Sequence, residues 1–324
     1  MALSDADRAM PAPTARPGDG RLMRWFNRRG WSDLIIATPY VWLLVFFFLP
    51  FLIVVGMSFA TRTPTAPPFS FGGEHPLFNL EGYARLFADS LYIRAFLTSV
   101  TNAAFATALC LLIGYPMALG LTRVSRSWRN VLLMLVILPF WTSFLLRVYA
   151  WMGLLGNNSW FNKGLTGLYN AMVPADWALR SIPMMNSNFA VVLVMVYSYL
   201  PFMILPLYAS LEKLDRTLDE AAMDLGSRPF RVFLDVTLPL SIPGMIAGGL
   251  LVFIPAAGEL IIPSLVGDAS SPMIGRVISD EFASARDWPM ASAVAVALLL
   301  LLVLPMMAYT HFEAKARQRA GDSA

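Results

Sequence analysis

The chain has few residues of the kinds that perform chemistry. Among its 324 residues are one cysteine, two histidines and three lysines, and only 14% of all residues are charged. Cys110 is alone, so no internal disulfide can form. The sequence has neither a Gly-x4-Gly-Lys-Ser/Thr loop that would cradle phosphates nor a His-Glu-x-x-His metal motif. We therefore expect no catalytic residues and no metal site in this chain.

Apolar residues dominate instead, at 57% of the sequence with a mean hydropathy of +0.60. A helix needs about 20 mostly apolar residues to cross a bilayer. The long apolar runs do not alternate in polarity as the strands of a membrane barrel do. The sequence thus predicts an all-α integral membrane protein with six spans, at about residues 34–60, 95–122, 131–155, 189–211, 238–262 and 290–310.

Two of these spans contain a charge, Arg147 in the third and Glu259 in the fifth. A charge in lipid is unfavourable and tends to face a cavity or a partner. One interpretation is structural: Arg147 and Glu259 form an ion pair, or their side chains extend to the outer membrane interface, and they only hold the bundle together. The other is functional: Glu259, placed after a helix break at Pro255 and Gly258, attracts a cation, and nearby aromatic rings add cation–π contacts. The candidate rings are those of Trp141, Tyr149, Trp151, Tyr197 and Tyr199.

Basic residues predict the orientation, since Lys and Arg near span ends are retained in the cytoplasm. With both termini inside, the cytoplasmic segments hold sixteen basic residues, against seven in the longer outer loops. Residues 1–30 read as a disordered cytoplasmic tail, and residues 313–324 as a second cytoplasmic tail. Because no basic run is interleaved with stacking aromatics, we expect contact with membrane lipid and none with nucleic acid.

The outer loops are substantial. Residues 156–188 and 264–289 contain Gly, Pro, Asn and Trp, which predicts ordered loops at the membrane surface. Asp280, Glu281 and Asp287 lie in the second of these loops. They would suit docking of a partner protein, but side chains of a solvated loop are the simpler interpretation.

A polar segment interrupts the apolar runs between the fourth and fifth spans, on the predicted cytoplasmic side. Thr217 and Glu220 have the spacing of a capping box, which predicts the start of a short helix. Gly226 is placed to end that helix in a left-handed conformation, and Pro229 suits the start of a second one. The segment is therefore expected to form two short helices that meet at a glycine. An amphipathic pair lying on lipid would give the same pattern.

The spacing within this segment resembles the signature of permease subunits of ATP-binding-cassette importers. That signature is Glu-Ala-Ala, three residues, Gly, nine residues, an aliphatic residue, any residue, Leu-Pro. The matching positions are Glu220, Ala221, Ala222, Gly226, Val236, Leu238 and Pro239. In this family the segment is the coupling helix that docks on the ATPase. The resemblance therefore implies a coupling role for Glu220, Ala221, Ala222, Asp224, Gly226 and Pro229.

From about residue 30 to 312 the chain is similar to the permeases of the polyamine importer family, of the putrescine type, through stretches such as "LVILPFWTSFLLRVYAWMGLL" and "LLVFIPAAGELIIPSLVG". The resemblance implies one permease transmembrane domain over residues 31–312, with the type I importer fold, in the bacterial inner membrane. It also implies three partners: a second, non-identical permease, a homodimeric cytoplasmic ATPase that binds ATP and Mg²⁺, and an extracytoplasmic polyamine-binding protein.

The expected function is ATP-driven import of a polyamine, with putrescine the first candidate, through a transport subunit that has no enzyme activity or cofactor of its own. Spermidine or another small cationic solute is the alternative within the same class. A self-sufficient secondary transporter is the alternative from another class, but it predicts an internal inverted repeat, and the sequence contains none.

Overall fold

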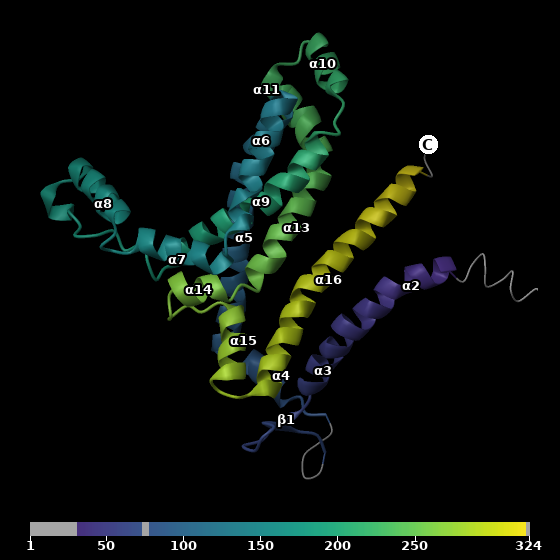
Figure 1. Ribbon diagram of the computed structural model, residues 1–324, viewed down its shortest axis with the longest axis vertical. Helices are drawn as coiled ribbons and strands as arrows, with labels where there is room; N and C mark the ends of the chain where they lie inside the picture. Colours follow the sequence, from purple (N-terminus) through teal and green to yellow (C-terminus); the bar gives the residue numbers. More distant parts are fainter. Residues whose placement is uncertain (1–30, 73–77, 322–324) are drawn as a thin grey trace, which may run out of the picture. The chain divides into compact units, whose positions relative to one another are not determined.

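The computed structural model describes residues 31–72 and 78–321. The predicted disordered tail, residues 1–30, lies outside the described residues, as do the last three residues of the predicted C-terminal tail. The described part is predominantly helical (Figure 1), which confirms the predicted fold class. A small exception is a two-stranded antiparallel pair, β1 (Thr61–Arg62) and β2 (Phe69–Ser70), in which Thr61 faces Ser70.

The chain divides into two compact units, the first ending at Gly56. Its described part is one helical run of α2 (Trp31–Leu43), a π-helical turn η2 (Leu44–Phe48) and α3 (Leu49–Met57). Residues 36–57 have a mean hydropathy of 2.5, and none of the side chains in that window is buried within this chain. A helix that is apolar on all sides is typical of a membrane span. This run matches the predicted first span, 34–60.

The core of the second unit is formed by three long helices, which pack side by side (Figure 1): α5 (Ser90–Arg123), α9 (Asn188–Leu211) and α13 (Ile242–Ala257). α5 and α9 cover the predicted second and fourth spans, whereas α13 covers only the middle of the predicted fifth span, 238–262. Many of the side chains buried between α5 and its neighbours are small, among them Ala103, Ala106 and Ala118. Small side chains let helix backbones approach closely, which is how helices associate within a membrane.

Two glycines bring α13 against α9. A β-carbon at Gly248 would lie 2.8 Å from the sulfur and 3.1 Å from the carbonyl oxygen of Met203. One turn earlier, a β-carbon at Gly244 would overlap the side chain of Ser210. Gly244 and Gly248 thus form a small-xxx-small pattern that sets the distance between the two helices.

Two further candidate spans are bent. α6 (Arg126–Ile137) continues through the 3₁₀ turn η3 (Leu138–Trp141) and turns by 90° into α7 (Phe144–Leu155) and α8 (Trp160–Met172). The helical run from Pro229 to Leu240 meets α13 at 63°. This run comprises α11 (Pro229–Val232), the π-helical turn η5 (Phe233–Thr237) and α12 (Leu238–Leu240).

By length and composition, the described residues contain three helices able to cross a membrane, or five if each bent pair counts as one span. α16 (Trp288–Gly321) adds an apolar stretch over Trp288–Leu304 that is shorter than these spans. The predicted count of six spans therefore stays a prediction. α16 also continues as helix to Gly321, beyond the predicted end of the last span at residue 310.

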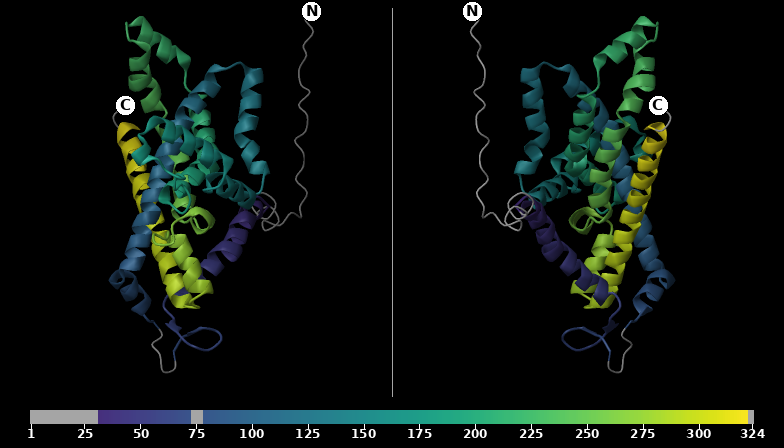
Figure 2. Two further views of the ribbon diagram at one scale, coloured as in Figure 1. Left: turned by 90° about the vertical axis from the view of Figure 1, so that its left-hand side faces the viewer. Right: turned by 90° about the vertical axis from the view of Figure 1, so that its right-hand side faces the viewer.

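Short helices complete the second unit at its two ends. At one end lie α10 (Arg216–Asp224) and α11; at the other lie α4 (Glu81–Ala88), the β1–β2 pair and α15 (Ile274–Ala283). Both views of Figure 2 show this separation, with the green α10–α11 segment opposite the blue α4. α14 (Ile261–Val266) and the 3₁₀ turn η4 (Ala175–Trp177) lie in the connections between the longer helices.

Candidate functional site

The α10–α11 segment turns at Gly226, as the sequence predicts. Gly226 has a φ of +86°, the left-handed region that favours glycine. Its N–H donates to the carbonyl oxygen of Met223 at 2.9 Å, and the N–H of Ser227 donates to that of Ala222 at 3.1 Å. This pair of bonds is a Schellman motif, which satisfies the last carbonyls of α10. α11 then begins at Pro229, also as predicted.

The predicted capping box at the start of α10 is wrong. The N-cap is Asp215, whose carboxylate accepts from the N–H of Thr217 at 3.0 Å, so Thr217 lies inside the helix. Aspartate caps helices at least as well as threonine, and here it stands one position ahead of the first helical residue. The pKa of Asp215 is lowered, mainly by the hydrogen bond from the N–H of Thr217 and secondly by the one from its hydroxyl. Both bonds favour the ionised carboxylate.

The α10–α11 segment leaves apolar side chains uncovered. Leu225 is 89% exposed and Phe230 is 70% exposed. The predicted coupling residues Glu220, Ala221, Asp224 and Pro229 are also exposed, while Ala222 is half-buried. The segment is nonetheless anchored, because the hydroxyl of Thr237 on η5 donates to Asp219 on α10 at 3.2 Å. A fixed helix pair that presents exposed leucine and phenylalanine is a surface suited to a protein partner.

The second part of the candidate site lies at the break between α13 and α14. The helix ends at Ala257, and Glu259 follows as a buried residue, 9% exposed. One carboxylate oxygen accepts from the N–H of Ile261 at 2.9 Å and from that of Ile262 at 3.4 Å. The other accepts from the hydroxyl of Tyr199. The predicted break after Pro255 is confirmed, and the Glu259 carboxylate accepts from the first two N–H groups of α14, although the N-cap residue of that helix is Leu260.

α15 closes over this break through a glycine. A β-carbon at Gly275 would lie 2.6 Å from the carbonyl oxygens of both Gly258 and Glu259. Only a residue without a side chain allows this approach of helix to backbone. The position of Glu259 is therefore set by three neighbours: Tyr199 on α9, the N-terminus of α14, and α15.

Arg147 does not pair with Glu259. No ion pair within 4.0 Å joins them among the described residues, so the predicted pairing is wrong, while extension of the two side chains to the outer interface stays a prediction. The guanidinium of Arg147 lies instead over two rings, 5.6 Å from the centre of Phe140 and 5.5 Å from that of Phe144. The carboxylate of Glu259 already has its donors, and Arg147 on α7 lies beside one ring of η3 and one of its own helix.

The structure brings together some of the predicted aromatic residues. Tyr199 contacts Glu259, and Trp151 packs edge-to-face on Tyr197 with the ring centres 5.4 Å apart. The rings of the other two candidates face away from the core: Trp141 is 69% exposed and Tyr149 is 53% exposed.

Two phenylalanines of this cluster were missed by the sequence analysis. Phe202 lies 6.3 Å from Tyr199 and 5.0 Å from Phe140, measured between ring centres. A row of side chains thus connects Arg147 to Glu259: Phe140, Phe202 and Tyr199. The signal available was spacing, since Phe202 follows Tyr199 by three residues and so shares its helix face.

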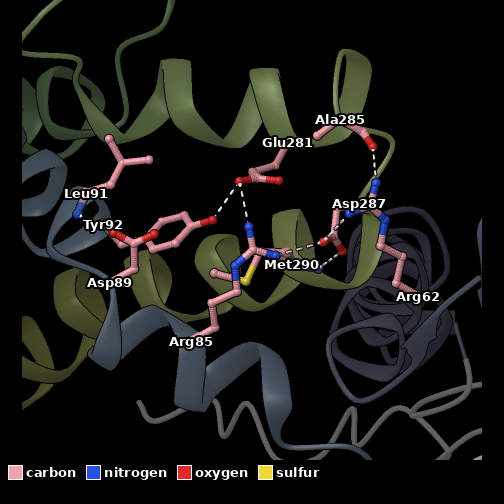
Figure 3. A network of polar contacts seen from close by, with 9 residues as sticks. All are labelled: Arg62, Arg85, Asp89, Leu91, Tyr92, Glu281, Ala285, Asp287 and Met290. Atoms are coloured by element: carbon pink, nitrogen blue, oxygen red, sulfur yellow. Dashed lines mark hydrogen bonds and ion pairs between the residues drawn. The ribbon is translucent and has the colours of Figure 1, made fainter.

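A network of charged side chains at the far end of the second unit was also missed (Figure 3). Asp287 accepts from Arg85 on α4 at 3.2 Å and from Arg62 on β1 at 3.5 Å. Glu281 on α15 accepts from the hydroxyl of Tyr92 on α5 at 2.6 Å, and it lies 4.0 Å from Arg85. The network therefore joins β1, α4 and α5 to α15 and Asp287, about 190 to 225 positions later in the sequence.

The interpretation of these acids as side chains of a solvated loop is wrong, because Asp280 and Glu281 lie on α15 and only Asp280 is solvent-exposed. Its side chain is 64% exposed, whereas that of Asp287 is 6% exposed and that of Glu281 12%. Their partners are about half exposed, so solvent weakens each ion pair. The carboxylates of Glu281 and Asp287 hold β1 and α4 against α15 and α16. These elements are therefore ordered relative to one another.

Comparison with known proteins places this fold in a family. Residues 110–318 match the family described as "Binding-protein-dependent transport system inner membrane component". The chain is 40% identical over 277 residues to a spermidine/putrescine transport system permease protein PotB of Haemophilus influenzae, covering 84% of this chain and 90% of that one. It is 39% identical over 275 residues to the PotB of Escherichia coli, covering 85% and 95%.

Solved structures show the same fold. A chain from a bacterial ABC transporter that imports alginate superposes with a TM-score of 0.67 at 15% identity, over 91% of this chain and 99% of that one. At that identity the likeness concerns the fold alone. The family match over more than half of the chain, with the relatives at 39–40% identity, shows that the chain belongs to the binding-protein-dependent transport system inner membrane components, as a membrane-spanning transport subunit rather than an enzyme.

Proposed function

We propose that the chain is the permease subunit of an ATP-driven polyamine importer, with putrescine as its main substrate and spermidine as the alternative. The names of its relatives support the substrate class. The observation that carries the proposal is Glu259, a buried carboxylate inside the apolar part of the chain, fixed by donors on two helices. A fixed negative charge in such surroundings favours passage of a cation.

The path for the polyamine is proposed to pass Glu259 and Tyr199, with Trp151 and Tyr197 beside it. An ammonium group that leaves water loses hydration, and a carboxylate held ready offsets part of that loss. Aromatic faces add about 0.5–2 kcal/mol each through cation–π contacts. The exposed rings of Trp141 and Tyr149 are proposed to contact lipid or a partner subunit instead.

Coupling to ATP is proposed to run through Glu220, Ala221, Ala222, Asp224, Gly226 and Pro229. In this scheme a homodimeric cytoplasmic ATPase, which binds ATP and Mg²⁺, receives the exposed Leu225 and Phe230 at the α10–α11 turn. A second, non-identical permease completes the path, and an extracytoplasmic binding protein delivers the polyamine. Both termini lie in the cytoplasm, an orientation supported by the sixteen basic residues on that side.

The test of this function replaces Glu259 with glutamine in the complete transporter, reconstituted in liposomes. Glu259→Gln keeps the shape and a hydrogen-bond acceptor but loses the charge. A charged hydrogen-bond partner contributes about 1.5–3 kcal/mol, so uptake of putrescine should fall by roughly tenfold or more. The complex should still assemble and hydrolyse ATP. Glu81→Gln, a change at an exposed carboxylate of α4, is the matched control and should transport normally.

Three results would contradict the proposal. Unchanged putrescine uptake by Glu259→Gln would remove Glu259 from the path. Equal uptake with and without the ATPase would favour a secondary transporter. Selective uptake of spermidine over putrescine by the unaltered complex would favour the alternative substrate.

A further inference from the structure

α8 has its polar and apolar faces reversed relative to a helix in water. Asn162, Thr166 and Asn170 recur every four residues and share one face, and Asn162 and Thr166 are 0% and 5% exposed. Trp160 and Leu168 belong to a second set, offset by two residues and therefore on the opposite face. Trp160 is 77% exposed and Leu168 is 55% exposed. A helix that faces water shows the opposite pattern.

The polar side chains of this face form hydrogen bonds within the chain. The side-chain amide of Asn162 donates to the carbonyl oxygen of Ile182 at 2.9 Å, and the Ile182 N–H donates to Asn162 and Thr166, each at 3.2 Å. Asn170 and the backbone of Leu179 exchange two hydrogen bonds of 2.9 Å. The segment 179–182 thus satisfies the polar face of α8, and the helix cannot turn that face outward without losing these bonds.

The apolar face has no charged residue. It consists of Trp160, Phe161, Gly164, Leu165, Gly167, Leu168, Ala171 and Met172. Met172 is 75% exposed, and nothing lies within 4 Å of a β-carbon at Gly164. Two exposed basic residues lie near it: Lys163 at the border of this face, and Arg180 in the segment that follows α8. Long basic side chains at such places can reach the headgroups while their stems lie along lipid.

We propose that α8 is an interfacial helix that lies on the membrane with this apolar face in the boundary between headgroups and acyl chains. Continuity supports lipid as the occupant, since residues 144–172 form the second limb of a bent apolar pair whose first limb is residues 126–141. α8 lies at the end of α7, away from α5, α9 and α13 (Figure 1). The exposed rings of Trp160 and Trp177 flank the helix, as aromatic residues do at membrane interfaces.

With the topology of the proposed function, α8 lies in the outer leaflet; this assignment rests on that function, whereas the contact with lipid does not. An interfacial helix buries its apolar face by about 5–10 Å. α8 would therefore fix the depth and the orientation of the α7 limb, which contains Arg147 and Trp151.

The experiment attaches a nitroxide spin label to single introduced cysteines in the full transporter, in nanodiscs of phosphatidylethanolamine and phosphatidylglycerol. Trp160→Cys, Leu168→Cys and Met172→Cys report on the apolar face. Asp176→Cys, at an exposed position just beyond the helix, is the matched control. Native Cys110 is buried and does not compete for the label.

The expected result is a several-fold higher collision rate with oxygen than with a water-soluble nickel chelate at positions 160, 168 and 172, and the reverse at 176. Equal access of the chelate to all four labels would overturn the proposal, because the face would then lie in water. Immobile labels reached by neither reagent would also overturn it, because a protein partner would then cover the face. Putrescine uptake by the same variants, reconstituted in liposomes, reports separately on the proposed function.

Discussion

The α9–α13 contact and the α10–α11 turn both depend on glycine, for opposite physical reasons. At Gly248 the backbone is ordinary helix, and the missing side chain is needed because Met203 occupies the space. At Gly226 the space is empty within 4 Å, and glycine is needed because the backbone has a φ of +86°. The first region is specified by packing and the second by backbone conformation.

The two regions also differ in whether their apolar side chains are buried or exposed. At the α9–α13 contact the apolar side chains pack against other residues of the chain, and Met203 and Leu207 are fully buried. The α10–α11 turn keeps its shape through hydrogen bonds, which leaves Leu225 and Phe230 exposed. A region held by its backbone can offer its side chains to a partner, and a region held by packing cannot.

The largest effect is expected from Gly244→Ala, which breaks the packed region. The added methyl group overlaps Ser210 and approaches the carbonyl oxygen of Pro206 at 3.1 Å, so the helices must separate. Overpacking of this kind destabilises by about 1–3 kcal/mol. We expect little folded protein in the membrane and a lowered melting temperature after solubilisation.

Gly249→Ala is the matched control for that change. Its methyl group would meet only Thr107, at an ordinary distance of 3.8 Å. Equal yields and melting temperatures for the two variants would show that Gly244 does not set the helix distance.

The next effect is expected from Gly226→Val, which breaks the turn and leaves the packing intact. A branched side chain disfavours the left-handed conformation by about 1–2 kcal/mol, which misaligns α11 relative to α10. We expect normal insertion and assembly with a loss of polyamine uptake relative to ATP hydrolysis. Gly226→Asn is the control, because asparagine adopts this conformation more readily. Normal uptake by the valine variant would mean that the turn tolerates rearrangement.

The smallest effect is expected from Asp287→Asn, in a third region that ion pairs hold together. Asparagine still accepts a hydrogen bond, and the two arginines it faces are about half exposed, so only about 1 kcal/mol is expected to be lost. The melting temperature of the solubilised protein should fall by roughly 2 °C. Asp280→Asn should leave it unchanged. A drop as large as that of Gly244→Ala would place this network among the main determinants of stability.

Sequence patterns predicted the features that depend on local chemistry. The turn at Gly226, the helix start at Pro229 and the break before Glu259 follow from residues adjacent in the chain, and the structure has all three. The N-cap at Asp215 was missed although it is local, because Thr217 and Glu220 offered a competing capping pattern at nearly the same place.

Features that depend on distant residues could not be predicted in this way. The partner of Glu259 is sixty positions away on α9, and Arg85 and Asp287 are separated by 202 positions. Residues 156–188 were expected to be an ordered loop, yet α8 forms within them. Its periodicity was hidden because the polar residues face inward, toward a backbone segment that only folding brings near.

Gly275 and Glu281 lie on the same short helix, and that has a mechanical consequence. α15 is a stiff rod of about 15 Å. One part of it rests directly on the carbonyl groups of Gly258 and Glu259, and the other is tied through Glu281 to Tyr92. Close-packed atoms transmit a push with little loss. Because no space remains at Gly275, a shift of α15 toward the break moves the backbone of Gly258 and Glu259 with it.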